Sequence, residues 1–337
     1  MSVEEFLAEW QSDSPTVLVH TSGSTGKPKP MRVEKRRMEA SARITCRFLG
    51  LHEGDTALLC MPLDYIAGKM MVVRALTCGL RLVSVPPSGH PLASPPPLEG
   101  PGEALSFAAM VPLQVYNSLQ DPLERERLRA IRHLIIGGGA IDEALAEQLK
   151  DFPHAVWSTY GMTETLSHIA LRRLNGPERT DWYTPFEGVG LSLSDDGCLV
   201  IDAPAVHEGP LVTNDIAELA GAGSRFRILG RKDNVVCSGG VKLQIEELEA
   251  RLRPHIGVPF MLTKRKDERL GEALVLLAET ADAVALRQVC RLVLTKYEVP
   301  KDYLSVGRLP VTETGKPARK EAMLLAEAAS GQSSARP

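Results

Sequence analysis

The chain has 337 residues, of which 44% are hydrophobic and 24% are charged, and its formal net charge is -3 at pH 7. This length is enough for a sizeable buried core and favours two domains. The charge gives no support for a nucleic acid or an anionic membrane as partner. Six cysteines without a C-x-x-C pair indicate neither a zinc site nor a disulfide framework. The acidic N-terminus and the lack of an apolar run of about 18 residues argue against secretion and membrane spanning, so we expect a cytoplasmic protein.

The first motif is a short strand predicted at residues 17–19, which leads into the loop TSGSTGKPK at 21–29. Its glycines let the backbone turn sharply and bring N–H groups close to anionic oxygens, while its hydroxyls and lysine add donors. A Walker-type phosphate loop is excluded, because that motif needs Gly at Thr21 and Ser or Thr at Pro28. An ordinary Gly/Ser turn is the alternative. The nucleotide-binding candidates of the loop are Thr21, Ser22, Gly23, Ser24, Thr25, Gly26 and Lys27.

The elements that follow alternate between strand and helix. Hydrophobic periodicity predicts helices over 34–49 and 69–77 and buried strands over 56–61 and 80–85. This alternation favours a partly parallel sheet. The segment 86–101 contains seven prolines, which predicts an exposed connection without helix or central strand.

A helical patch at 121–130 then leads into a strand at 131–136, a glycine turn at 137–139 and a helix from about Asp142. Beyond about residue 233 the pattern predicts two strands around the turn KDERLGE, an amphipathic helix over 281–297 and a last strand near Leu304. We therefore expect a large α/β domain at 1–231, a small α+β domain at 232–326 and a disordered tail at 327–337.

Four further segments follow the loop in a fixed order: LIIGGGAI at 134–141, STYGMTETLSH at 158–168, LVTND at 211–215 with FRILGRKDNVVCSGGVKLQIEELE at 226–249, and LPVTETGKPARK at 309–320. With the loop, this series resembles the acyl-adenylating superfamily, which includes acyl-CoA synthetases, luciferases and the adenylation domains of peptide synthetases. The resemblance implies a large adenylating domain and a small, mobile C-terminal domain. Relatives usually carry a long subdomain before the loop, so we expect an N-terminally shortened first domain that keeps its activity. A catalytically silent nucleotide-binding protein is the alternative.

The resemblance also implies two-step chemistry. An acid attacks the α-phosphate of ATP and releases pyrophosphate, and the thiol of CoA then displaces AMP from the acyl-AMP. ATP, Mg²⁺ and CoA are therefore the expected cofactors and co-substrate. Lys316 resembles the lysine that bridges the acyl carboxylate and the α-phosphate, Thr163 the hydroxyl that reaches the α-phosphate, and Glu164 the magnesium ligand. For Lys316, a solvated loop lysine is the alternative.

Nucleotide recognition is implied in the same way. Asp215 resembles the carboxylate that accepts from the ribose hydroxyls, although an Asp in LVTND could simply form a turn, and Arg231 resembles the arginine that reaches the ribose or phosphate. Asp233 stands at the position of the family hinge. Gly239 and Gly240 could line a pantetheine tunnel or make a simple β-turn. The adenine-side candidates are Gly138, Gly139, Ala140, Thr159, Tyr160, Gly161 and Met162.

The acid pocket is implied by the resemblance, and spacing adds candidates to it. Tyr65 stands where the family often has an aromatic gate, Lys69 lies four residues further, and Ser167 and His168 follow the magnesium segment. A lysine that faces the pocket suggests a second carboxylate on the substrate. A solvated Lys69 and a surface His168 are the alternatives.

Chain length and motif variants together resemble short o-succinylbenzoate:CoA ligases of bacterial menaquinone biosynthesis. The alternative within the class is a CoA ligase for another aromatic or short carboxylic acid. The expected partners are thus small molecules (the acid, ATP and CoA), and a monomer and a homodimer are both compatible with the sequence.

Overall fold

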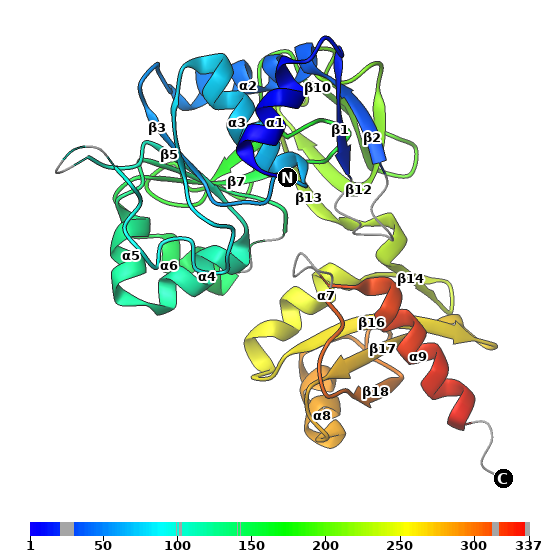
Figure 1. Cartoon of the computed structure of the whole chain (residues 1–337). Helices are drawn as coiled ribbons and strands as arrows, with labels where there is room; N and C mark the ends of the chain where they lie inside the picture. The colour runs from blue at the N-terminus through cyan, green and yellow to red at the C-terminus, as the bar shows by residue number, and fades with distance from the viewer. Residues whose placement is uncertain are drawn as a thin grey trace.

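The computed structural model describes residues 1–20, 30–98, 100, 103–139, 141, 143–311 and 317–333. Its elements form two lobes, the first built from α1 to β13 and the second from β14 to α9 (Figure 1). The largest hydrophobic core contains residues from Phe6 to Phe226, and the second lobe has separate clusters that run from Val236 to Leu294 and from Met261 to Ala326. Within the described part of the chain, no helix is long and apolar enough to cross a membrane.

The main sheet has seven strands in the order β4-β3-β5-β6-β7-β8-β9. The strands from β4 to β7 pair in parallel, and β8 and β9 are added antiparallel, which confirms the partly parallel sheet. Their bounds are β3 (Thr56–Leu59), β4 (Arg81–Ser84), β5 (Phe107–Met110), β6 (His133–Ile136), β7 (Ala155–Gly161), β8 (His168–Arg173) and β9 (Thr184–Pro185).

Helices cover both faces of this sheet. Figure 1 shows α2 and α3 on one face and α4, α5 and α6 on the other. In the sheet, β4 lies on one side of β3, whereas β5, β6 and β7 follow one another on the other side. Because the crossovers between parallel strands are right-handed, this reversal of direction places the helices on opposite faces. Strand order therefore reverses between β3 and β5, and ligands of such folds bind outside the carboxyl ends of the strands at this point. The helices are α2 (Lys35–Leu49), α3 (Ile66–Cys78), α4 (Pro112–Gln120), α5 (Pro122–Arg129) and α6 (Glu143–Leu149).

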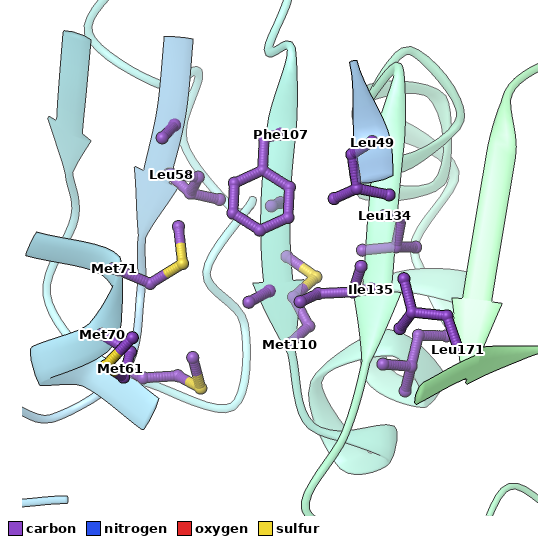
Figure 2. Packing of buried hydrophobic residues seen from close by; sticks show 14 of the residues in the cluster. Leu49, Leu58, Met61, Met70, Met71, Phe107, Met110, Leu134, Ile135 and Leu171 are labelled. Carbon is purple, nitrogen blue, oxygen red and sulfur yellow. The ribbon is translucent and has the colours of Figure 1, made fainter. Parts of the chain in front are cut away.

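The core of the first lobe lies between this sheet and its helices. All residues of β3 and β5 are buried, as expected for parallel strands that are covered on both faces. Figure 2 shows Leu58, Phe107 and Leu134 side by side along the sheet, with Met70 and Met71 of α3 packed against it. Each such side chain stabilises the fold by about 1.5–3 kcal/mol. The packing thereby fixes the strand ends that carry the candidate site.

Two smaller antiparallel units complete the first lobe. Strand β1 (Thr16–His20) confirms the strand predicted before the loop 21–29, and it pairs with β2 (Pro30–Glu34) as a hairpin. The segment 86–98 contains neither helix nor strand, as its prolines predicted. The remaining elements are α1 (Val3–Gln11) and a four-stranded sheet of β10 (Gly190–Leu193), β11 (Cys198–Asp202), β12 (Leu211–Ala220) and β13 (Arg225–Arg231).

The second lobe is an α+β unit of five strands that pack against helices. The two strands predicted around KDERLGE are β16 and β17, and the predicted amphipathic helix is α8, which ends earlier than expected. The short helix η1 (Lys232–Asn234) precedes the second lobe. The elements of the lobe are β14 (Val235–Ser238), β15 (Val241–Gln244), α7 (Ile245–Leu252), η2 (Arg253–His255), β16 (Phe260–Asp267), β17 (Gly271–Ala278), α8 (Ala283–Val293), β18 (Asp302–Ser305) and α9 (Arg319–Ser333).

Helix α9 corrects one prediction. It continues to Ser333, whereas the sequence analysis placed a disordered tail from residue 327. The segment is rich in Ala, Leu and Glu, which favour helix, and the buried side chains of Ala322 and Ala326 pack it against the second lobe. Packing at Ala322 and Ala326 therefore supports a helix that continues past residue 327.

Candidate active site

The segments predicted to bind adenine meet at the carboxyl ends of β6 and β7. These strands pair in parallel, with Ile136 opposite Ser158, so residues 137–139 and 159–162 leave the sheet side by side. A side chain at Gly137 would collide with the hydroxyl of Thr159, which makes glycine necessary there. Gly138 adopts a φ of 80°, a conformation that favours glycine. The structure thus brings the two predicted segments together.

Asp215 lies at the centre of a polar cluster beside these segments. The Tyr160 hydroxyl donates to Asp215 Oδ2 at 2.6 Å, and Arg231 Nη1 donates to Oδ1 at 3.1 Å. The three residues come from β7, β12 and β13, and Asp215 is 9% exposed. Burial and the charge of Asp215 raise the pKa of Tyr160, so its hydroxyl remains a neutral donor. The predicted ribose pair is therefore assembled, and its role in nucleotide binding stays a prediction.

Arg231 also contacts the predicted hinge. Its Nε lies 3.0 Å from Asp233 Oδ1 and its Nη2 lies 3.1 Å from Asp233 Oδ2, a bidentate ion pair. Desolvation lowers the pKa of Arg231, but the hydrogen bond to Asp233 and the charge of Asp215 outweigh it, so the pKa is raised overall. Arg231 therefore remains a cation that joins the first lobe to η1, the turn between the lobes.

The turn between β7 and β8 presents Glu164. Thr165 is fully buried, and its hydroxyl accepts from the Met162 amide at 3.0 Å and lies 2.7 Å from the Ser167 carbonyl. This turn holds Thr163 in a buried position and leaves Glu164 exposed at the end of the sheet. Among the described residues, no group of three or more His, Cys, Asp or Glu could hold a metal ion. A single exposed carboxylate suits a magnesium ion that phosphate oxygens bind for the most part.

A buried arginine, Arg74 of α3, lies beside the predicted acid-pocket residue Ser167 and was not predicted from the sequence. It is 2% exposed, and its Nη2 donates to Ser167 Oγ at 2.7 Å. Its Nε is buried without a hydrogen-bond partner, and no described carboxylate pairs with it. Burial lowers its pKa to about 10, so it is still a cation at neutral pH. A charged residue inside the apolar run MMVVRAL was the signal that could have identified it.

Lys69, the cation that the sequence assigned to the acid pocket, lies elsewhere. It is buried, but its Nζ lies 3.4 Å from Glu9 Oε2 and 4.9 Å from the centroid of the Phe6 ring. Helix α1 therefore neutralises Lys69, and the prediction that it faces a substrate carboxylate is wrong. Tyr65 is the N-cap of α3 and forms an isolated bridge with His20, so it lies beside the end of β1.

Ser167 and His168 do lie together, opposite α3. His168 is 7% exposed, so the alternative of a surface histidine is wrong. Its Nδ1 is 3.1 Å from Ser167 Oγ, and its Nε2 is 3.2 Å from Thr45 Oγ1 of α2. Burial and the charge of Arg74 hold the pKa of His168 well below its usual value, so the imidazole is neutral. Thr45 was not predicted, because it is far from the motifs in sequence.

Gly239 and Gly240 form the turn between β14 and β15, with φ values of 58° and 82°. The Gly239 amide donates to the Leu270 carbonyl at 2.8 Å. The β-turn alternative is therefore confirmed, and the pantetheine tunnel stays a prediction. The loop 21–29, Ala140, Asp142 and Lys316 lie outside the described residues.

Comparison with known proteins identifies the family. Residues 3–213 match the AMP-binding enzyme family. The chain belongs to this family. A solved acyl-CoA synthetase (AMP-forming)/AMP-acid ligase II-like protein from Dyadobacter fermentans is 34% identical, with a TM-score of 0.63, over 96% of this chain and 92% of that one. Together with the curated relatives, the match confirms the predicted class, an AMP-forming acyl-CoA synthetase.

The curated relatives are more specific in name. A 2-succinylbenzoate–CoA ligase from Listeria monocytogenes serotype 4b is 26% identical over 340 residues, which cover 92% of this chain and 70% of the relative. The structure of o-succinylbenzoate coenzyme A synthetase from Bacillus subtilis, solved with ATP and magnesium ion, is 22% identical, with a TM-score of 0.72, and 70% of it is covered. This second likeness supports the fold.

Proposed function

We propose that the chain joins o-succinylbenzoate to CoA through an acyl-AMP intermediate, a reaction of menaquinone biosynthesis. The observation that carries the choice of acid is the buried cation of Arg74, which no described carboxylate neutralises. The curated relatives named 2-succinylbenzoate–CoA ligase support the same choice. The cytoplasmic location stays a prediction.

Arg74 implies an anionic ligand because a buried charge without an opposite charge beside it is unfavourable, and its contacts with the Phe107 ring and the Met71 sulfur supply none. Within the described residues its only polar oxygen contact is Ser167, which accepts one hydrogen bond and carries no charge. A substrate carboxylate would supply the missing counter-charge and accept a further hydrogen bond from the guanidinium. An acid with two carboxylates can place one against Arg74 while the other reacts. This arrangement selects a dicarboxylic acid over its monocarboxylic analogues.

The nucleotide is assigned to the opposite side of the turn 162–167. Asp215 accepts from the ribose hydroxyls, and Arg231 and Tyr160 hold its carboxylate in place. Thr163 and Glu164 face the phosphates, and Glu164 holds the magnesium ion. When bound, this ion offsets the phosphate charge that would otherwise repel the incoming carboxylate. The loop 21–29 supplies further backbone and hydroxyl donors to the same phosphates.

The second lobe carries residues for both steps of the reaction, adenylation and transfer to CoA. Lys316 bridges the acyl carboxylate and the α-phosphate during adenylation. Rotation about Asp233, at the boundary between domains 1–231 and 232–326, then withdraws Lys316 and brings the Gly239–Gly240 turn to the thiol of CoA. The glycines suit this position because they let a thin pantetheine arm pass close to the backbone. Arg231 and Asp233 form a bidentate ion pair at this boundary.

The test is pyrophosphate release with ATP, magnesium and CoA against o-succinylbenzoate, benzoate, coumarate and acetate. Preference for o-succinylbenzoate by at least about tenfold in kcat/KM is expected, since one charged hydrogen bond distinguishes it from the others. Preference for another acid would support the ligase activity and refute o-succinylbenzoate as the substrate. If no acid causes pyrophosphate release although ATP binds, the chain is a nucleotide-binding protein without turnover.

A further inference from the structure

Arg74 and three further side chains form a chain of hydrogen bonds that runs from α3 through the turn 162–167 to α2. Arg74 Nη2 lies 2.7 Å from Ser167 Oγ, which lies 3.1 Å from His168 Nδ1. His168 Nε2 lies 3.2 Å from Thr45 Oγ1, which lies 3.1 Å from the Ser41 carbonyl. Apart from Ser167, which is partly buried, these residues are at most 7% exposed.

The two ends of this chain fix the direction of every hydrogen bond within it. The Ser41 carbonyl can only accept, so the single proton of the Thr45 hydroxyl is given to it and Thr45 Oγ1 must accept from His168 Nε2–H. A neutral imidazole that carries its proton on Nε2 accepts at Nδ1, so it takes the Ser167 proton. Ser167 therefore presents only lone pairs to Arg74, which can only donate.

We infer that Thr45 and His168 are positioning residues that determine specificity: through Ser167 they hold the Arg74 guanidinium in the orientation that receives the second carboxylate of the acid. This inference rests on the proposed function of Arg74. A hydroxyl with a free rotor could turn its proton toward the guanidinium and displace it. The chain of hydrogen bonds from Thr45 through His168 and Ser167 to Arg74, called the relay below, removes that freedom before the substrate arrives. Such pre-organisation raises affinity without a new contact.

Thr45 is the residue on which the relay depends. Without its hydroxyl, His168 Nε2–H has no partner among the described side chains that contact it, and the proton gains more by moving to Nδ1. An Nδ1–H would then donate to Ser167 and turn the serine proton toward Arg74. The expected consequence is a weaker site for the dicarboxylic acid and an unchanged site for an acid without the second carboxylate.

The experiment compares Thr45→Val with Thr45→Ser, which keeps the hydroxyl. The readout is the ratio of kcat/KM for o-succinylbenzoate to kcat/KM for whichever one-carboxylate analogue is turned over. Thr45→Val should lower this ratio about tenfold, and Thr45→Ser should keep it within about twofold. A long-range ¹H–¹⁵N NMR spectrum of the wild-type imidazoles, with His168 assigned by its loss in His168→Gln, should show the proton on Nε2.

An Nδ1–H tautomer in the wild-type protein would overturn the relay, and so would an unchanged ratio in Thr45→Val while Arg74→Met lowers it. The NMR measurement needs only the wild-type chain and the assignment variant, so it decides the matter even if Thr45→Val does not fold. A loss equal for both acids, with a lower Tm, would make Thr45 structural and also refute the inference. An unchanged ratio in Arg74→Met would instead refute the proposed acid site.

Discussion

Replacing Arg74 with Met tests the assignment of the acid site. The two side chains are similar in length, and the change removes a charge that no described carboxylate balances. If Arg74 pairs with the second carboxylate, the variant leaves that carboxylate desolvated and unpaired, which costs about 2–5 kcal/mol. At 1.4 kcal/mol per tenfold, kcat/KM for o-succinylbenzoate should fall by about 30- to 4,000-fold.

The folded protein should tolerate this change. Burial lowers the pKa of Arg74 from its ordinary value to about 10, which means that the charged form is disfavoured in the folded state by about 3 kcal/mol at neutral pH. The loss of the hydrogen bond to Ser167 offsets about 1–3 kcal/mol of this gain. We therefore expect a Tm at or above that of the wild type, measured by calorimetry.

Lys69→Met is the matched control, since Lys69 is a second buried cation on α3 that already has Glu9 as its partner. It should leave the preference for the dicarboxylic acid unchanged. The reasoning is refuted if Arg74→Met lowers the Tm and impairs dicarboxylic and monocarboxylic acids equally, because that pattern belongs to a structural arginine. It is also refuted if Lys69→Met alone abolishes the preference.

Three further predictions follow from the ion pairs and the buried histidine. Asp215→Asn should weaken ATP binding about 10- to 100-fold by calorimetry, because a charged hydrogen bond to the ribose is worth about 1.5–3 kcal/mol; unchanged affinity would remove Asp215 from the nucleotide site. His168 is held neutral in the folded protein and gains a proton on unfolding below its ordinary pKa of about 6.5. The free energy of unfolding should therefore decrease as the pH falls below about 6.5, by up to about 1.4 kcal/mol per pH unit, and urea titrations of His168→Gln should show a smaller slope. An equal slope in the variant would contradict the assignment. Arg319→Met should destabilise the second lobe by about 3–5 kcal/mol in urea unfolding, because it leaves Glu249 buried without its partner, and Arg319→Met with Glu249→Leu should recover most of the loss.

The sequence predicted those parts of the fold that depend on local pattern. The apolar runs of β3 and β6 identified buried strands because parallel strands covered on both faces are continuously apolar. The resemblance implied that Asp215 and Arg231 act together, and the structure places them opposite each other in the register of neighbouring strands, while their contact with the ribose stays a prediction. In such cases the motif itself contains the spatial relation.

The acid pocket was predicted less well because its contacts join distant segments. Lys69 and Arg74 are both buried cations on one helix, and only the position of Glu9 on α1 shows that the first is neutralised. Thr45 and His168 are 123 residues apart in sequence, so no periodicity indicates their contact. Which cation is free for a ligand is therefore a property of tertiary packing.

The most direct test of the central claim is product analysis. The purified protein is incubated with ATP, magnesium, CoA and o-succinylbenzoate, and the mixture is resolved by liquid chromatography and mass spectrometry, with controls that omit the acid or CoA. AMP and the o-succinylbenzoyl-CoA thioester are expected in equal amounts, and acyl-AMP is expected in the absence of CoA. Formation of ADP in place of AMP, or ATP that stays intact while bound, would contradict the central claim.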